Sequence, residues 1–197
     1  MKIDYFLSLV SPYAYLGGDE LANIAAKHDA EVNVKPIDLS QIFPKTGGLP
    51  LAKRAPERQA YRLTELTRWS RYLNRPLNLH PRFFPAAEGL AARMVLAAGQ
   101  TGGDALQLAN AFGRAVWAEE RNIADTPTLL EIAAENGYDA ASLMEAASLA
   151  ETESRYQTCS QEALGKGVFG VPTYIFNEEL FWGQDRLLFL DRALAET

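Results

Sequence analysis

The sequence is poor in the residues that most disulfide and metal chemistry requires. Its 197 residues include one cysteine, Cys159, and two histidines, His28 and His80. A single cysteine cannot form an internal disulfide, which excludes the disulfide framework of a small secreted protein. So few soft ligands also argue against a zinc site. We therefore expect no metal cofactor and a reducing, cytoplasmic location.

The sequence also lacks an excess of positive charge and any long apolar run. It has 19 Lys and Arg against 25 Asp and Glu, which gives a formal net charge of −6. Nucleic-acid binding needs a basic face, so we expect no nucleic-acid partner. No apolar stretch approaches the roughly 20 residues that span a bilayer, and MKIDYF is unlike a signal peptide. We therefore expect no association with a membrane.

Strand patterns occur at both ends of the chain, with helical patterns between them. The strand patterns cover residues 2–10, 31–37, 168–176 and 180–182. Helical spacing covers residues 12–28, resumes in several segments from 57 to 165, and begins again after Gly183. Residues 38–56 are punctuated by proline and glycine and predict an irregular loop. The first strand, helix and second strand predict a parallel βαβ unit.

This order predicts an α/β protein of the thioredoxin fold, a βαβ…ββα sheet with an inserted all-helical subdomain. Three local features agree with it. A strand turns directly into a helix at Ser11, a Val171-Pro172 bond precedes a strand, and Asp185 lies where the last helix begins. The thioredoxin fold commonly has a cis proline at the second of these places.

The predicted domain boundaries follow from the same order. Residues 1–40 and 168–197 are expected to form a discontinuous thioredoxin-like domain. Residues 41–167 are expected to form a linker loop and the helical insertion. The insertion thus separates two halves of one sheet.

The helix that begins at Ser11 lacks the cysteines that thioredoxin-like redox proteins carry there. The four residues are Ser-Pro-Tyr-Ala, so disulfide exchange at this place is excluded. A helix N-terminus that attracts anions, a hydroxyl donor and backbone groups beside Pro172 remain. They suit a thiolate carried by another molecule, such as glutathione, whose backbone can add to the edge before Pro172. Taken alone, Ser11 would be a simple N-cap.

Six segments, in order, resemble the 2-hydroxychromene-2-carboxylate isomerase family, relatives of kappa-class glutathione transferases that have the DsbA-like fold. The resemblance covers essentially the whole chain. The segments are SPYAYL at 11–16, YRLTELTRWSRYLNRPL at 61–77, RFFP at 82–85, VWAEERNIAD at 116–125, FGVPT at 169–173 and FWGQDRL at 181–187.

The resemblance implies a glutathione-dependent isomerase that acts on an unsaturated aromatic acid. It assigns Ser11 as the catalytic donor that holds the glutathione sulfur as a thiolate. The backbone of Val171 and Pro172 would pair with the cysteinyl part, and Gln184 and Asp185 would hold the γ-glutamyl end. The thiolate adds reversibly to the substrate, so glutathione is a cofactor that is not consumed. The family also implies a homodimer.

The sequence departs from the family on the expected acceptor side. Ala52 stands where the family often has asparagine, and Ala86-Ala87 follows RFFP where an asparagine is common. As a hypothesis, the cations at and near Lys53 still bind an acidic substrate. The alternative is that these residues only form a solvated face or pack in the ordinary way. The residues assigned to substrate binding are Tyr13, Lys53, Arg54 and Trp182.

Two other functions stay open. A kappa-like glutathione transferase would use the same thiolate but consume it against an electrophilic acceptor. A non-catalytic thioredoxin-fold binding module would use Ser11 only as an N-cap, so Ser11→Ala would leave its function unchanged.

Overall fold

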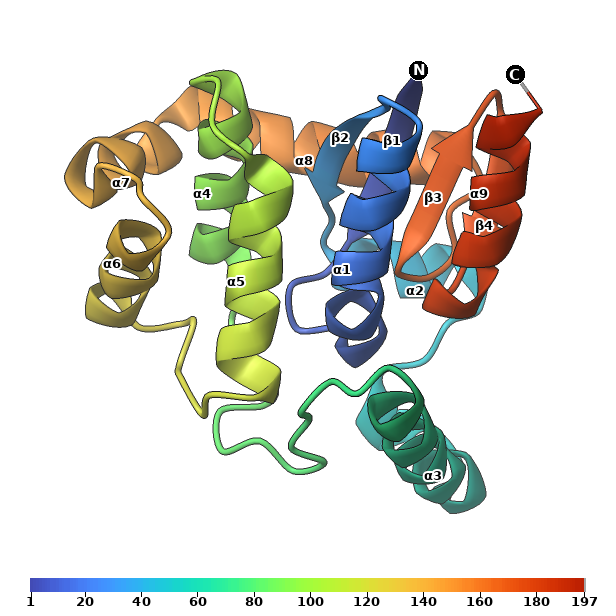
Figure 1. The fold of residues 1–197 in the computed structure, drawn as a ribbon. Coiled ribbons are helices and arrows are strands. Elements are labelled where there is room, and N and C mark those ends of the chain that lie inside the picture. The colour runs from blue at the N-terminus through green and yellow to red at the C-terminus, as the bar shows by residue number, and fades with distance from the viewer. Residues whose placement is uncertain (197) are drawn as a thin grey trace.

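The computed structural model describes residues 1–196 and is built on a four-stranded mixed sheet (Figure 1). The strands follow the spatial order β2-β1-β3-β4. Their bounds are β1 Lys2–Leu7, β2 Glu31–Pro36, β3 Thr173–Phe176 and β4 Glu179–Trp182. β1 and β2 pair in parallel, whereas β1–β3 and β3–β4 are antiparallel. The predicted parallel βαβ unit and the ββα ending are therefore confirmed.

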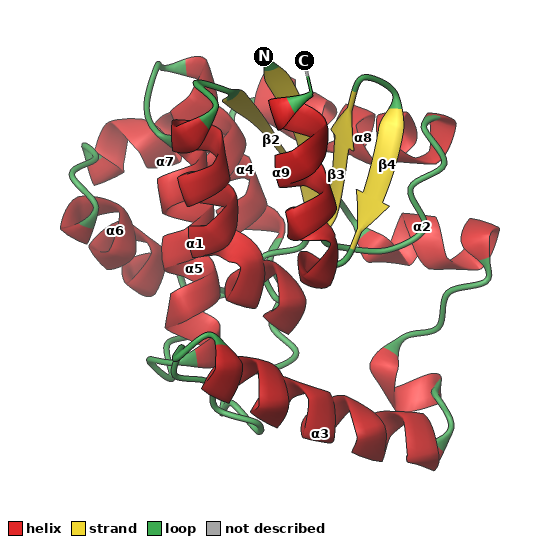
Figure 2. Ribbon diagram, turned by 45° about the vertical axis from the view of Figure 1, so that its right-hand side comes forward, coloured by secondary structure: helices red, strands yellow, loops and turns green. Residues whose placement is uncertain are grey.

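Helices cover both faces of this sheet. In Figures 1 and 2, α1 and α9 lie side by side on one face, and α8 crosses the other. No helix within residues 1–196 is long and apolar enough to cross a membrane. The helical bounds are α1 Pro12–Lys27, α2 Leu39–Thr46, η1 Leu51–Lys53, α3 Pro56–Tyr72, α4 Gly89–Gln100, α5 Ala105–Trp117, α6 Thr126–Glu135, α7 Ala140–Ser148, α8 Ala150–Gly165, η2 Gln184–Arg186 and α9 Leu187–Ala195.

The segment from 38 to 56 is more ordered than we expected from its prolines and glycines. It contains α2 and the short 3-10 helix η1. Asp38 caps α2 by accepting a hydrogen bond from the Ser40 N–H (2.8 Å), and Gly47 ends the helix in the left-handed conformation (φ 77°). Buried Ile42 holds α2 to the core. The prediction of an irregular loop here was wrong because these caps and one apolar anchor suffice for two turns.

Two of the predicted strands were too long. β1 ends at Leu7 and not at residue 10, and β3 begins at Thr173 and not at residue 168. The residues that lie outside the observed strands form two loops. Both loops lie at the same edge of the sheet, because Phe6 pairs with Thr173. This edge is where α1 begins.

Sheet and helices share one hydrophobic core. Tyr5 and Tyr174 stack inside it with ring centroids 5.1 Å apart, and α4 and α8 both pack on β2. The division into residues 1–40 and 168–197 against 41–167 stays a prediction, and its last residue, 197, lies outside the described residues.

Candidate active site

Ser11 is the N-cap of α1, and it is almost buried (9% exposed). Its Oγ accepts a hydrogen bond from the Ala14 N–H (3.3 Å), and its own N–H donates to the Ser8 carbonyl (3.0 Å). The capping bond uses only the oxygen. The Ser11 hydroxyl hydrogen has no acceptor within residues 1–196, so the group can cap the helix and still donate a hydrogen bond.

The loop before β3 offers free backbone groups on the same edge of the sheet. The Val171-Pro172 peptide is cis, as predicted. The Pro172 carbonyl accepts from the Gly183 N–H (2.9 Å), whereas neither backbone group of Val171 has a hydrogen-bond partner within residues 1–196. Val171 is also partly exposed. An extended peptide could therefore add to this edge as a further strand.

The turn before α9 approaches α1 very closely. Gly183 has φ 102°, which favours glycine, and Gln184 is buried against Gly17 of α1. A Cβ on Gly17 would lie 2.8 Å from the Gln184 Cβ, so only glycine fits there. The Gln184 amide has no hydrogen-bond partner within residues 1–196, and Asp185 forms an ion pair with Arg186 (3.3 Å).

The spacing of these groups fits a tripeptide. Gly17 lies six residues after Ser11 on α1, which is a rise of about 9 Å along the helix. An extended tripeptide spans about 10 Å. Backbone contacts tie the parts together, since the Gly183–Pro172 bond joins the turn at Gln184 to the loop at Val171.

A carboxylate from a distant part of the chain holds the loop that leads to Ser11. Glu88, just before α4, accepts hydrogen bonds from the Ser8 hydroxyl (2.6 Å), the Leu9 N–H (2.5 Å) and the Val10 N–H (3.3 Å). The residue keeps part of its surface exposed, but its carboxylate lies in the interior. Burial raises the pKa of Glu88 to about 7, against the lowering effect of its three hydrogen bonds.

Tyr13 lies in the first turn of α1 and faces α3. Burial raises the pKa of the Tyr13 hydroxyl, and the nearby charges of Arg62 and Arg54 act in the opposite direction. The structure thus brings Tyr13 and Arg54, two predicted residues, together with Arg62, which was not predicted. Figure 1 places α3 beside the end of the molecule where α1 begins.

Arg62 is a partly buried cation without an anion. Its guanidinium lies over the rings of Phe84 (5.7 Å) and Trp117 (5.6 Å), and burial lowers its pKa. It has no hydrogen bond and no carboxylate partner within residues 1–196. Three of the other partly buried arginines are paired with carboxylates: Arg75 with Asp19, Arg93 with Glu153, and Arg121 with Glu135.

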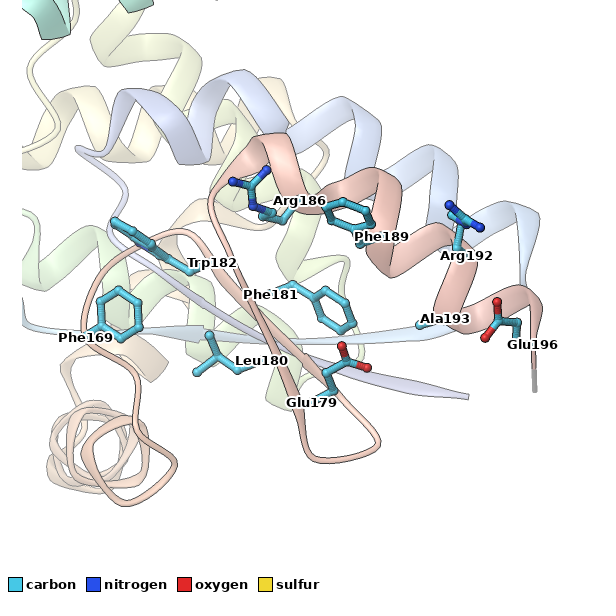
Figure 3. Close-up of a pocket in the computed structure, with 10 residues that line it drawn as sticks. All are labelled: Phe169, Glu179, Leu180, Phe181, Trp182, Arg186, Phe189, Arg192, Ala193 and Glu196. Carbon is cyan, nitrogen blue, oxygen red and sulfur yellow. The ribbon is translucent and has the colours of Figure 1, made fainter.

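The remaining predicted acceptor residues are less enclosed. Lys53 is exposed in η1, and Arg54 donates to the Leu49 carbonyl (2.9 Å). Trp182 is 49% exposed and lies edge-on to Phe169 (4.7 Å). Both rings line a pocket of about 560 Å³ between β4 and α9 (Figure 3), and Ser11 is not among the residues that line it. The role of these residues in substrate binding stays a prediction.

Sequence reasoning missed Glu88 and Arg62 for different reasons. Glu88 contacts Ser8 across 80 residues of sequence, and no local pattern predicts such a contact. Its only signal was its position after Ala87, where the chain departs from the family. Arg62 lies in a helix with several exposed cations, and it is distinguished by being partly buried without a partner carboxylate.

Two curated enzymes are similar to this chain in sequence. The 2-hydroxychromene-2-carboxylate isomerase of Pseudomonas putida is 29% identical over 200 residues, which cover 99% of this chain and 95% of that protein. Glutathione S-transferase kappa 1 of Rattus norvegicus is 22% identical over 206 residues, covering 98% and 91%. These relatives confirm the resemblance and the prediction of an enzyme.

Two solved structures confirm the fold. A 2-hydroxychromene-2-carboxylate isomerase matches with a TM-score of 0.83 and 23% identity, covering 100% of this chain and 95% of that one. The cytosolic disulfide reductase DsbM of Pseudomonas aeruginosa, solved with GSH, matches with a TM-score of 0.72 and 20% identity, covering 99% and 100%. A family model for the DSBA-like thioredoxin domain matches residues 2–195. Because that match spans nearly the whole chain, the chain belongs to the family of DSBA-like thioredoxin domains.

Proposed function

We propose that the protein is a glutathione-dependent isomerase of the 2-hydroxychromene-2-carboxylate type. One observation carries the proposal most directly: the Ser11 hydroxyl caps α1 through its oxygen while its hydrogen has no acceptor within residues 1–196. We infer that this hydrogen is donated to a thiolate, because the N-terminus of α1 favours an anion at the same place. A cysteine at position 11 would compete with an incoming sulfur; a serine does not.

The groups around Ser11 fit the rest of glutathione. The free backbone N–H and carbonyl of Val171 suit the cysteinyl peptide groups, while Gln184 and Asp185 suit the γ-glutamyl end. Asp185 would attract the glutathione amine, and the unpaired Gln184 amide would bind its α-carboxylate. The likeness to a disulfide reductase that was solved with GSH, and to a kappa-class glutathione transferase, supports the same cofactor.

In the proposed reaction the thiolate adds to the substrate and later leaves it. The sulfur electron pair forms a C–S bond, and the conjugated double-bond electrons move to the oxygen of the conjugated acid or ketone. The former double bond is then single and can rotate. Return of the electrons expels the thiolate, which Ser11 again stabilises, so glutathione leaves unchanged.

On the acceptor side, the structure favours Arg62 as the cation for an acidic substrate, in addition to Lys53 and Arg54, which the sequence predicts. Arg62 is near Tyr13, two residues after Ser11, and lies on an aromatic surface formed by Phe84 and Trp117. An aromatic carboxylate could bind the guanidinium and stack on Phe84, which is partly exposed, whereas Trp117 is fully buried. Arg75, Arg93 and Arg121 are already paired with carboxylates and could not serve without losing a partner.

Glutathione titration by calorimetry tests the cofactor. We expect saturable binding to the wild type, weaker binding to Asp185→Asn, and unchanged binding to Asp191→Asn. Asp191 is a matched control because it lies on α9 but pairs with Lys27 (2.8 Å) and His28 (2.7 Å), outside the site. An absence of binding at millimolar glutathione would overturn the isomerase and the transferase together.

A kappa-like glutathione transferase is the second candidate, favoured by the rat relative. Product analysis separates the two, since an isomerase returns glutathione and a transferase leaves a stable conjugate. If Ser11→Ala instead left every measured function intact, the protein would be a non-catalytic binding module.

We also propose a cytoplasmic homodimer. Exposed aromatic rings gather around the pocket between β4 and α9, which Phe169, Trp182 and Phe189 line together with Arg186 and Glu179 (Figure 3). Such a patch with charges of both signs can meet its own copy across a two-fold axis. Light scattering of the wild type and of Trp182→Glu tests this, and a monomeric wild type would contradict it.

A further inference from the structure

The carboxylate of Glu88 is the ionisable group most closely bonded to the loop that carries Ser11. It is hydrogen-bonded to the amide of Val10, the residue immediately before Ser11, and to Ser8 and Leu9. Ser11 in turn donates its N–H to the Ser8 carbonyl. The place of Ser11 at the mouth of α1 therefore depends on a side chain from the helical segment.

Glu88 can hold this loop in either ionisation state. When ionised, it accepts all three hydrogen bonds. When neutral, one oxygen still accepts from the Leu9 and Val10 amides, while the other can donate its proton to the Ser8 hydroxyl, which both donates and accepts. Protonation thus removes a negative charge beside Ser11 and leaves the loop anchored.

Asp38 and Tyr156, whose charges interact with that of Glu88, keep their state near neutral pH. Asp38, before α2, has a pKa held below its usual value by hydrogen bonds from Ser40 and Gln41 against the effect of burial. Burial raises the pKa of Tyr156 on α8 further above neutrality. On α4 itself, Arg93 is paired with Glu153 (2.7 Å). Of these groups, Glu88 is the one with a pKa near 7.

We propose that Glu88 positions Ser11 through residues 8–10 and takes up a proton when a thiolate binds at Ser11. This role rests on the proposed function, because it requires the thiolate. The thiol S–H bond breaks, the sulfur keeps the electron pair, and its proton goes to solvent. Glu88 takes an equivalent proton from solvent. A thiolate at Ser11 and an ionised Glu88 bonded to the preceding residue would be two negative charges that oppose each other, and this exchange avoids their coexistence.

The proton balance of glutathione binding tests the coupling. Calorimetry at neutral pH in buffers of different protonation enthalpy gives the number of protons released per glutathione bound. Glu88→Gln preserves the size and the anchoring of the neutral acid but cannot take up a proton. We expect the wild type to release roughly half a proton fewer than Glu88→Gln, and Glu145→Gln, an exposed acid on α7, to match the wild type.

The outcomes are distinguishable. Equal proton release by the wild type and Glu88→Gln, with normal binding, would overturn the coupling alone. An absence of glutathione binding to the wild type would end the proposed function and the coupling with it.

Amide hydrogen exchange tests the positioning role without glutathione. We expect the Leu9 and Val10 amides to be protected in the wild type and in Glu88→Gln, and to exchange at least tenfold faster in Glu88→Ala. If Glu88→Ala does not fold, Ser8→Ala removes a single one of the three bonds and should accelerate both amides less. Unchanged exchange in the variant that folds would overturn the positioning role.

Discussion

Replacing Glu88 with glutamine should change how the stability of the protein depends on pH. In the unfolded chain a glutamate has a pKa near 4.5, and burial raises the pKa of Glu88 to about 7 in the fold. Since each factor of ten in proton affinity corresponds to about 1.4 kcal/mol, this raise corresponds to roughly 3 kcal/mol. The value is an upper limit, because Glu88 keeps some contact with water.

The direction of this pH dependence follows from whether the folded or the unfolded protein binds the Glu88 proton. Between pH 4.5 and 7 the folded protein keeps the Glu88 proton while the unfolded chain has lost it, so the wild type loses stability as pH rises through this range. Below pH 4.5 the penalty is absent, and above pH 7 it is constant. Glu88→Gln has no proton to lose and resembles the neutral acid, so this part of the pH dependence should vanish.

Urea unfolding followed by tryptophan fluorescence, repeated from pH 4 to pH 8, measures the effect. The free energy of unfolding of Glu88→Gln should be close to that of the wild type at pH 4 and should exceed it by up to about 3 kcal/mol at pH 8. All other groups titrate equally in both proteins, so their contributions cancel in the difference between the two free energies of unfolding. Glu145→Gln should follow the wild type throughout. A difference that stays flat, or that favours the wild type at high pH, would mean that the three donors hold Glu88 ionised, and the reasoning would be refuted.

Three further predictions concern the site itself. Ser11→Ala should lower turnover by about 10²-fold while costing about 1 kcal/mol as a lost N-cap; wild-type turnover in a steady-state assay would exclude the thiolate-donor role. Arg62→Gln should raise KM for an acidic acceptor by at least tenfold and leave glutathione affinity unchanged, and Arg58→Gln, exposed on the same helix, should change neither. Gly17→Ala should weaken glutathione binding measured by calorimetry, because its Cβ would meet the Gln184 Cβ at 2.8 Å; unchanged affinity would show that the turn at Gln184 does not bind the cofactor.

The fold could be predicted largely because its signals are local. Strand patterns, the Ser11-Pro12 helix start and the Val171-Pro172 bond each occupy a few adjacent residues, and their order along the chain is that of a known topology. The errors were also local. Caps at Asp38 and Gly47 stabilise a helix in a segment whose prolines predicted a loop. The strand pattern of residues 2–10 continued past the end of β1.

The charge environment of the site could not be predicted in the same way. Glu88 reaches the Ser11 loop from 80 residues away, and its burial depends on how α4 begins at that edge of the sheet. Arg62 is distinguished by being partly buried on aromatic rings without a carboxylate partner among residues 1–196, and only the packed structure reveals this combination. Residue types and spacing predict which groups are present, whereas burial decides their pKa values and their partners.

The two sides of the site differ in how firmly they are held. The thiol side is tied to the core by short-range contacts: Glu88 to Leu9, Pro172 to Gly183, and Gly17 against Gln184. The acceptor side depends on α3, a 17-residue helix in which Leu66 alone is buried. A helix with so little buried surface has low local stability and can shift at small energetic cost. Under the proposed function, glutathione binding should therefore resist substitutions in α3, whereas acceptor choice should respond to them.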